Sequence, residues 1–229
     1  MNKVGVVIAA AGQGKRMGHN INKQFLPLLG KPMLYYTIKA FADWGKAAEI
    51  VIVLNSKEIN YFKKKIKPLF SYSSQKTFSL VSGGKSRKES VYNGISSLSY
   101  NISYVLIHDG ARPLIEKSLI ESTYQAVKEH KAVSCGVKVK DTIKLVDDSI
   151  CQQTLNRDKL RAIQTPQAFD LDLIKRAHQN YHKEKALDDA SLVELLGEKV
   201  YIVDGDYNNL KITTAEDLKP AEVILKERM

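Results

Sequence analysis

The sequence predicts an α/β protein built on one mostly parallel, doubly wound sheet with helices on both faces. Strand-like and helix-like segments alternate along most of the chain, which is the pattern of βαβ units. Several strand segments, such as residues 4–10 and 104–108, are near-continuous apolar runs, which is typical of strands buried on both faces. The length of 229 residues suits one well-buried domain, so we expect a single domain over residues 1–229.

The expected elements begin with a strand at Val4–Ala10 and a helix at Pro32–Trp44. Pro32 fits the first turn of that helix, and Gly45 fits the stop that follows it. Next come, in order, a strand at Ile50–Leu54, a lysine-rich helix carrying Ile59, Phe62 and Ile66, a strand at Phe78–Val81, a helix carrying Val91, Ile95 and Leu98, a strand at Tyr104–His108, a helix at Ser118–His130 and a strand at Ala132–Val137. The chain closes with helices near Leu171–Tyr181 and Asp189–Leu196, a strand at Val200–Val203 and a helix from Ala215, which Thr214 and Asp217 cap.

Residues 138–157 depart from this alternation. The segment from Lys138 to Val146 partly alternates polar and apolar residues, Asp147-Asp148-Ser149 is typical of a turn, and a second extended run follows. We therefore predict a protruding β-hairpin at about 138–157. Its polar strands fit an exposed edge hairpin, and they fit equally an arm that reaches across a dimer interface, where a partner would cover its edges.

Composition narrows the class of protein. The formal net charge of +10 favours an anionic partner, without distinguishing nucleic acid from nucleotide or phosphate. The densest basic run, at 63–67, lies on the lysine-rich helix and is interpreted as a solvated helix face. No apolar stretch reaches the roughly 18 residues that span a bilayer, and no signal-peptide pattern is found, so we expect a cytoplasmic protein. Cys135 and Cys151 have no His or Cys partner at zinc-site spacing.

The first strand ends in a glycine loop, Ala10-Ala11-Gly12-Gln13-Gly14-Lys15-Arg16-Met17-Gly18. Glycines directly after a strand let backbone N–H groups approach a phosphate closely, and Lys15, Arg16 and Lys23 add positive charge. The loop matches neither common nucleotide motif, because Met17 stands where the dinucleotide fingerprint has Gly or Ala and Arg16 where a P-loop has Ser or Thr. We interpret it as a phosphate cradle; a plain glycine turn is the alternative.

A second loop follows the strand that ends at His108 and reads Asp109-Gly110-Ala111-Arg112-Pro113. Ligands of such sheets bind outside the carboxyl ends of the strands, so Asp109 is expected to face the ligand crevice. Its carboxylate suits Mg²⁺, which binds few carboxylates together with substrate phosphates. Arg112 offers a bidentate fork for a phosphate, while a structural ion pair between Asp109 and Arg112 is the alternative. His108 is interpreted as structural.

Two further loops converge on the same edge of the sheet. The loop at 83–90 carries paired glycines and hydroxyls that suit a base or ribose, and Lys211 in the loop at 208–213 is placed to reach a phosphate. The loops together hold several cations and one carboxylate, with no Ser-His-Asp order and no histidine cluster. This set favours phosphoryl or nucleotidyl transfer, in which the protein stabilises charge on phosphorus and a metal ion neutralises a triphosphate.

With these loops in place, the chain resembles the 2-C-methyl-D-erythritol 4-phosphate cytidylyltransferases of the non-mevalonate isoprenoid pathway over nearly its whole length. The resemblance rests on the segments 10–17, Lys23-Gln24-Phe25, Gly83-Gly84 with Arg87 and Ser90, 105–113, Val139-Lys140-Asp141-Thr142, Arg157, 165–169, Asp188-Asp189-Ala190-Ser191 and 209–213. The most specific string is His108-Asp109-Gly110-Ala111-Arg112. The resemblance implies a Rossmann-like sheet of the nucleotide-diphospho-sugar transferase type with a hairpin dimerisation arm.

The resemblance also implies a reaction: CMP passes from CTP to 2-C-methyl-D-erythritol 4-phosphate, and pyrophosphate leaves. On this basis the loop of Ala10, Ala11, Gly12 and Gly14 would hold the CTP phosphates, with Arg16 and Lys23 stabilising the transition state. Gly84, Ser90 and Gly110 would line the cytidine site near Thr165. Asp109 would meet Mg²⁺, and Arg112, Arg157 and Lys211 would position the polyol phosphate. Because the arms exchange in the homodimer, Thr142 and Arg157 would serve the neighbouring active site.

Three positions depart from the pattern of the family. Ala9 stands where a proline is usual, Lys85 where an acidic residue is common, and Leu187 where a threonine often contacts the polyol phosphate. Two alternatives stay open. One is a ribitol-5-phosphate cytidylyltransferase of teichoic-acid synthesis, which shares the glycine loop. The other is a basic nucleotide- or RNA-binding module without catalysis, although the tyrosines do not cluster with basic residues as stacking platforms do.

Overall fold

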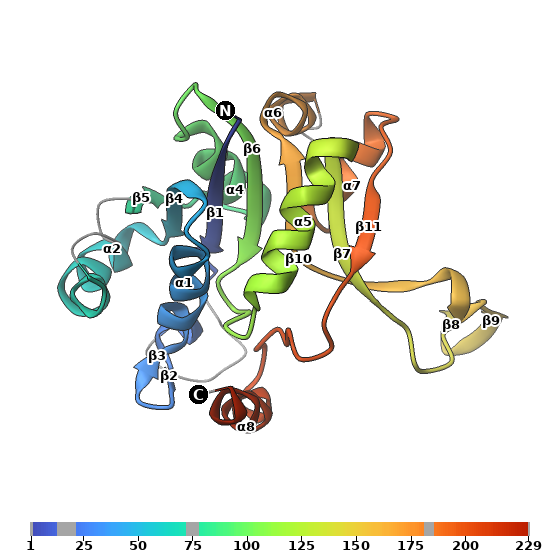
Figure 1. Ribbon diagram of the computed structural model, residues 1–229. Coiled ribbons are helices and arrows are strands. Elements are labelled where there is room, and N and C mark those ends of the chain that lie inside the picture. The colour runs from blue at the N-terminus through green and yellow to red at the C-terminus, as the bar shows by residue number, and fades with distance from the viewer. Residues whose placement is uncertain (1, 13–21, 72–77, 181–185, 229) are drawn as a thin grey trace.

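The computed structural model describes residues 2–12, 22–71, 78–180 and 186–228 (Figure 1). Its centre is one seven-stranded sheet in the order β11-β7-β10-β6-β1-β4-β5. The strands are β1 (Lys3–Ala10), β4 (Ala47–Leu54), β5 (Phe78–Ser82), β6 (Ile102–Asp109), β7 (Ala132–Lys138), β10 (Arg161–Asp170) and β11 (Tyr201–Asp204). All neighbouring strands pair in parallel except at β10, which runs antiparallel to both β6 and β7. The predicted α/β fold with a mostly parallel, doubly wound sheet is confirmed.

The strand β10 was not predicted, and it lies inside the sheet. Its sequence carries Pro166, and proline within a strand argues against a central position because it lacks the N–H that a ladder needs. The structure accommodates the proline at an irregularity, since the pairing with β7 shifts register between Gln164 and Gln167. The carbonyl oxygen of Pro166 accepts a hydrogen bond from the Sγ of the buried Cys135 (3.3 Å). The irregularity therefore lets a segment that contains proline lie inside the sheet.

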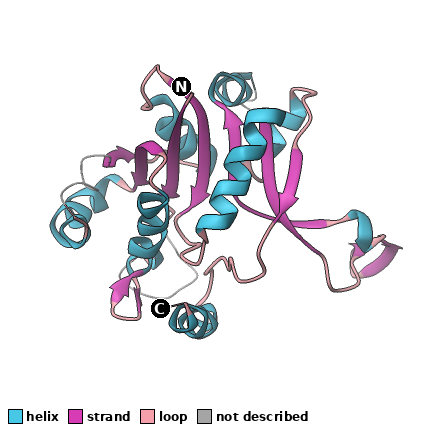
Figure 2. Ribbon diagram, in the orientation of Figure 1, coloured by secondary structure: helices cyan, strands magenta, loops and turns pink. Residues whose placement is uncertain are grey.

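Helices cover both faces of the sheet (Figure 2). On one face, α1 (Met33–Trp44) and α5 (Lys117–His130) pack Ile38, Phe41 and Ile120 against β1, β4 and β6. On the other face lie α4 (Arg87–Ser96), α6 (Leu171–Asn180) and α7 (Asp189–Leu195), whose apolar side chains surround Val7, Val53 and Ile107. Side chains of β1 thus alternate between two cores, as strands buried on both faces require. Gly45 ends α1 in the left-handed conformation (φ 76°), as predicted.

The lysine-rich segment is less regular than predicted. It forms a 3₁₀ turn at Ser56–Glu58, a single α turn at Ile59–Tyr61, a π turn at Phe62–Ile66 and a 3₁₀ turn at Lys67–Leu69. Phe62 and Ile66 are fully buried, while Lys63, Lys64 and Lys65 are exposed. The expected apolar stripe and solvated face are therefore present without one continuous α-helix.

Two peripheral parts complete the described chain. The strands β8 (Lys144–Asp147) and β9 (Ile150–Thr154) form an antiparallel hairpin that extends away from the central sheet (Figure 1). At the other end, a capping box of Thr214 and Asp217 starts the 3₁₀ turn Ala215–Asp217, and α8 (Leu218–Glu227) follows. Short strands β2 (Pro27–Leu28) and β3 (Lys31–Pro32) pack near α8 in a third apolar cluster. The described helices include none long and apolar enough to cross a membrane.

Candidate active site

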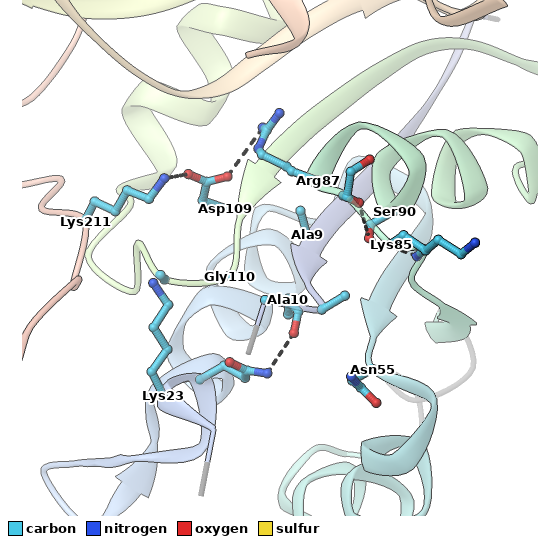
Figure 3. A pocket seen from close by; sticks show the side chains of 16 residues that line it. Ala9, Ala10, Lys23, Asn55, Lys85, Arg87, Ser90, Asp109, Gly110 and Lys211 are labelled. Carbon is cyan, nitrogen blue, oxygen red and sulfur yellow. Dashed lines mark hydrogen bonds and ion pairs between the residues drawn. The ribbon is translucent and has the colours of Figure 1, made fainter. Parts of the chain in front are cut away.

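The main cavity lies at the carboxyl ends of β1, β4 and β6 and has a volume of about 530 Å³ (Figure 3). Its lining includes nine of the residues that the sequence predicts: Ala10, Ala11, Gly12, Lys23, Gly84, Ser90, Asp109, Gly110 and Lys211. These residues come from four separate loops, and the parallel sheet brings the loops together because its strands end at the same edge. The predicted convergence of the loops is confirmed.

Asp109 is the last residue of β6, and its carboxylate forms ion pairs with two cationic side chains. One carboxylate oxygen, Oδ2, lies 2.6 Å from Nζ of Lys211, and the other, Oδ1, lies 3.4 Å from Nη2 of Arg87 (Figure 3). Burial alone raises the pKa of a carboxyl group, but Arg87 and Lys211 outweigh it and hold the pKa of Asp109 well below its usual range. Asp109 is therefore an anion in the folded protein. The ion pair between Asp109 and Arg112 that sequence reasoning kept as an alternative is not among the described contacts of Asp109.

The floor of the cavity is shaped by Gly110. Its N–H donates to the carbonyl oxygen of Ala9 (2.9 Å), which ties the Asp109 loop to the end of β1. A Cβ at position 110 would lie 2.9 Å from the Cβ of Ala10 and 3.2 Å from the oxygen of Ala9. Because real Cβ atoms hardly ever come that close, only glycine lets these two strand ends meet.

The wall opposite Asp109 is the loop that starts α4. Ser86 caps this helix by accepting the N–H of Glu89 (3.1 Å). The hydroxyl of Ser90 accepts the N–H of Gly84 (3.0 Å) and donates to the carbonyl oxygen of Ser86 (2.8 Å). A Cβ at Gly84 would lie 2.2 Å from the Cγ of Glu89, so a larger residue would displace the loop. Ser90 therefore shapes the Gly84 backbone as well as lining the cavity.

The glycine loop is described only as far as Gly12. The side chain of Gln24 donates to the carbonyl oxygen of Ala10 (2.8 Å) and so fixes the point where β1 ends (Figure 3). Lys23 lies beside it, with Nζ 3.4 Å from the carbonyl oxygen of Ile212. The predicted residues Gly14 and Arg16 lie outside the described residues.

Two predicted residues lie behind the cavity rather than on its lining. Arg112 is 9% exposed and its Nη1 donates to the carbonyl oxygen of Asn209 (2.7 Å). Thr165 is 5% exposed and its Oγ1 accepts the N–H of Asp109 (3.1 Å), while Asn209 donates to the Thr165 carbonyl oxygen (2.8 Å). In this structure both residues thus support the Asp109 loop from below.

The two predicted arm residues, Thr142 and Arg157, are exposed, and neither of them lines this cavity. The Nη1 of Arg157 donates to the carbonyl oxygen of Lys140 (2.7 Å) at the base of the arm. A second cavity of about 520 Å³ opens there, with Lys138, Lys140, Arg157 and Arg161 around one carboxylate, that of Asp158. The base of the arm is therefore strongly basic.

Among the cavity-lining residues to which sequence reasoning gave no role of their own are Arg87 and Asn55. Arg87 is the first residue of α4, and Asn55 directly follows β4. Asn55 carried the usable signal of a polar residue at the end of a parallel strand. Arg87 had no such signal, because its position beside Asp109 depends on how α4 packs on the sheet.

The lining favours an anionic ligand. Its charged side chains are the four cations Lys23, Lys85, Arg87 and Lys211 and the single carboxylate of Asp109, among the residues that the structure describes. Facing backbone amides and cations suit a phosphate chain. A group of three or more His, Cys, Asp or Glu side chains at metal distance is absent from the described part of the chain. One carboxylate nevertheless fits Mg²⁺, which takes its other ligands from phosphates and water.

Comparisons with known proteins agree with this geometry. The family described as 2-C-methyl-D-erythritol 4-phosphate cytidylyltransferase matches residues 4–227. A relative of that name from Clostridium perfringens is 46% identical over 229 residues, which cover 99% of this chain and 100% of the relative. Another from Alkaliphilus oremlandii is 46% identical over 231 residues, which cover 100% of this chain and 97% of the relative.

Solved structures show the same fold. The 4-diphosphocytidyl-2C-methyl-D-erythritol synthase of Anaerococcus prevotii superposes with a TM-score of 0.86 at 33% identity and covers 98% of this chain and 99% of that one. The 2-C-methyl-D-erythritol 4-phosphate cytidylyltransferase of Thermus thermophilus superposes with a TM-score of 0.79 at 29% identity, with 98% and 99% covered. Both similarities extend over 98% of this chain.

Proposed function

This chain belongs to the 2-C-methyl-D-erythritol 4-phosphate cytidylyltransferase family and is a nucleotidyltransferase, and from that premise we propose its reaction. It transfers CMP from CTP to 2-C-methyl-D-erythritol 4-phosphate. An oxygen of the acceptor phosphate attacks the α-phosphorus of CTP, the bond from that phosphorus to the bridging oxygen breaks, and pyrophosphate leaves. The products are 4-diphosphocytidyl-2-C-methyl-D-erythritol and pyrophosphate.

The observation that carries this proposal is the pairing of one ionised carboxylate with several cations at the ends of parallel strands. Asp109 lies between Lys211 and Arg87, and Lys23 lines the same cavity. Two phosphate-bearing substrates bring several negative charges, which these cations are placed to neutralise. A preorganised set of this kind stabilises charge that develops on phosphorus without having to reorganise during the reaction.

Each part of the cavity receives a role in this proposal. The backbone at Ala10, Ala11 and Gly12, continuing to Gly14, holds the triphosphate, and Lys23 with Arg16 stabilises the transition state. The wall formed by Gly84 and Ser90 and the floor at Gly110 face the cytidine. Lys211 positions the acceptor phosphate, and Arg112 and Thr165 hold the Asp109 loop in place.

A divalent cation such as Mg²⁺ completes the proposed site. Asp109 supplies the hard oxygen that such a cation prefers, and CTP supplies phosphate oxygens. Bound there, the cation neutralises part of the triphosphate charge and polarises the phosphate that is attacked. Lys211, which pairs with Asp109 in this structure, would then be available to a substrate phosphate.

We further propose that the arm acts in a homodimer. The hairpin β8–β9 exposes Leu145, Val146 and Ile150 (54%, 53% and 65%), which is costly for an arm that stands alone in water. The hairpin extends away from the central sheet (Figure 1), and the segment at its base is basic and includes Arg157. Placed in a partner's active site, Arg157 adds the positive charge that a second phosphate needs, and Thr142 adds a hydroxyl that can donate to it.

The proposed reaction is tested by pyrophosphate release from CTP and Mg²⁺ with two acceptors in parallel. Release with 2-C-methyl-D-erythritol 4-phosphate and not with ribitol 5-phosphate is expected. Release with ribitol 5-phosphate alone would keep the chemistry and change the acceptor. This outcome has a specific motivation, because Leu187, at a position where the family often has threonine, is 91% exposed and offers no hydrogen bond.

The arm proposal is tested with heterodimers. A heterodimer of an Arg157→Ala chain and an Asp109→Ala chain contains one intact site if the arm acts in trans, so about half of the wild-type activity is expected. Each homodimeric variant serves as the control and should be inactive. An inactive heterodimer of verified composition would show that Arg157 serves its own chain.

A further inference from the structure

Arg87 divides one guanidinium between two carboxylates. Its Nη2 lies 2.8 Å from Oδ2 of Asp189 and 3.4 Å from Oδ1 of Asp109. The shorter contact is therefore with Asp189, at the start of α7, and the longer one is with Asp109, in the cavity (Figure 3 shows the contact with Asp109). Asp189 does not line the cavity and is 1% exposed.

Asp189 is held firmly where it lies. Its N–H and that of Ala190 both donate to Oε1 of Gln167 (3.1 and 3.2 Å), so the first turn of α7 is tied to β10. Its other carboxylate oxygen lies 3.4 Å from Nε2 of His178, a fully buried side chain of α6 that stacks on Tyr92. Burial opposes the charge, yet Arg87 and then His178 outweigh burial and lower the pKa of Asp189.

The division matters because Asp109 has a second task. A buried arginine that faced Asp109 alone would form a short, charge-assisted pair, and a cation approaching Asp109 would have to break it. Lys211 presents less of an obstacle, since its side chain is 42% exposed and can turn toward solvent or phosphate. The side chain of Arg87 is 34% exposed, and its backbone is fixed at the start of a helix. How strongly it pairs with Asp109 therefore depends on its other partner, Asp189.

We propose that Asp189 is a positioning residue that acts through Arg87: it draws the guanidinium away from Asp109 and so leaves the Asp109 carboxylate able to bind the divalent cation. This inference rests on the proposed function, in which Asp109 meets that cation. It assigns a task in the reaction to a buried carboxylate that touches neither substrate nor cation.

The test measures cation binding separately from turnover. Mn²⁺ is titrated into the complex of the enzyme with CTP, without acceptor, and bound Mn²⁺ is followed by electron paramagnetic resonance. In Asp189→Asn, Arg87 loses the closer of its two carboxylate partners and pairs with Asp109 alone. The affinity for Mn²⁺ should therefore fall at least fivefold. The Mg²⁺ concentration for half-maximal turnover should rise by a similar factor, while kcat at saturating Mg²⁺ stays within about threefold of wild type.

Two further variants separate positioning from folding. Asp188→Asn neutralises the adjacent carboxylate, which caps α7 through Ser191 and has no contact with Arg87, so Mn²⁺ affinity should be unchanged. In Arg87→Met/Asp189→Asn the competing guanidinium is gone, so Mn²⁺ affinity should return to the wild-type value or exceed it. This double variant also removes the Arg87–Asp109 pair that the single variant leaves, and it guards against failure of the single variant to fold.

Three results would overturn the inference: unchanged Mn²⁺ affinity in Asp189→Asn, an equal loss in Asp188→Asn, or further loss in the double variant. Each of these results can be measured as long as the wild-type enzyme binds Mn²⁺ in the presence of CTP. A wild type that neither binds Mn²⁺ with CTP nor releases pyrophosphate would instead refute the proposed function, so the two failures are distinct.

Discussion

The hydroxyl of Thr165 lies 3.0 Å from Nδ1 of the buried His108 and donates its hydrogen to that nitrogen. The direction follows from the other ring nitrogen, Nε2, which lies 3.1 Å from the carbonyl oxygen of Arg112 and must donate because a carbonyl only accepts. The same hydroxyl accepts the N–H of Asp109 (3.1 Å). His108 thus fixes the backbone from which the Asp109 carboxylate projects.

Thr165→Val should destabilise the protein by at least about 2 kcal/mol. Valine keeps the shape of threonine but leaves the Asp109 N–H and Nδ1 of His108 buried without partners, at roughly 1–3 kcal/mol for each such group. Urea denaturation measures the loss. Thr165→Ser keeps the hydroxyl and should lose about 1 kcal/mol or less; equal losses in the two variants would mean that the hydroxyl contributes nothing.

Stability should fall between pH 6.5 and 4 because of His108. Burial lowers the pKa of this histidine from 6.5 to about 4, so the unfolded chain binds the proton first as the pH drops. The stabilisation is complete above pH 6.5 and is lost as the pH falls toward 4, with a total on the order of 3 kcal/mol. Thermal denaturation of wild type and His108→Gln at pH 7 and pH 5 should therefore show a smaller drop in Tm for the variant. Parallel drops would contradict this.

Gly110→Ala and Gly12→Ala should fail in different ways. The added Cβ at 110 meets Ala10 and the oxygen of Ala9, so Tm should fall by several degrees and kcat/KM at least tenfold. Among the described residues, none has an atom within 4 Å of a Cβ built at Gly12, so Tm should be kept while the methyl group intrudes on the bound nucleotide and raises KM for CTP. Calorimetry and steady-state kinetics on both variants check the contrast. A normal Tm for Gly110→Ala would disprove the close approach.

Asp109→Asn should separate nucleotide binding from catalysis. Losing the carboxylate frees Lys211 for phosphate, while Arg87 keeps its shorter contact with Asp189, so CTP should bind at least as tightly as in wild type when no divalent cation is present. Without a hard anionic ligand for the cation, kcat should drop at least a hundredfold. Isothermal titration with and without Mg²⁺, together with turnover, gives both values. Weaker CTP binding in the absence of metal would mean that Asp109 serves the nucleotide directly.

Much of the site was readable from local sequence. Ala10, Gly12, Asp109 and Gly110 directly follow or end strands, and parallel strands end at one edge, so their convergence follows from the alternation of elements alone. The capping box of Thr214 and Asp217 could also be predicted from local sequence. The two residues satisfy each other's backbone N–H groups without contacts from the rest of the fold. The arm was visible from its turn and its polar strands.

The order of strands, the place of β10 and the contacts of Arg87 were decided only by tertiary structure. Pro166 lies in a central strand, where an irregularity in the pairing with β7 accommodates it. Arg87 stands 22 residues from Asp109 and 102 from Asp189, and nothing in its own segment says that both carboxylates will share it. Local sequence determines which residues follow a strand. Which charges meet in the interior depends on how the helices pack across the sheet. There, burying a charge without a partner costs free energy, so charged side chains are found in ion pairs.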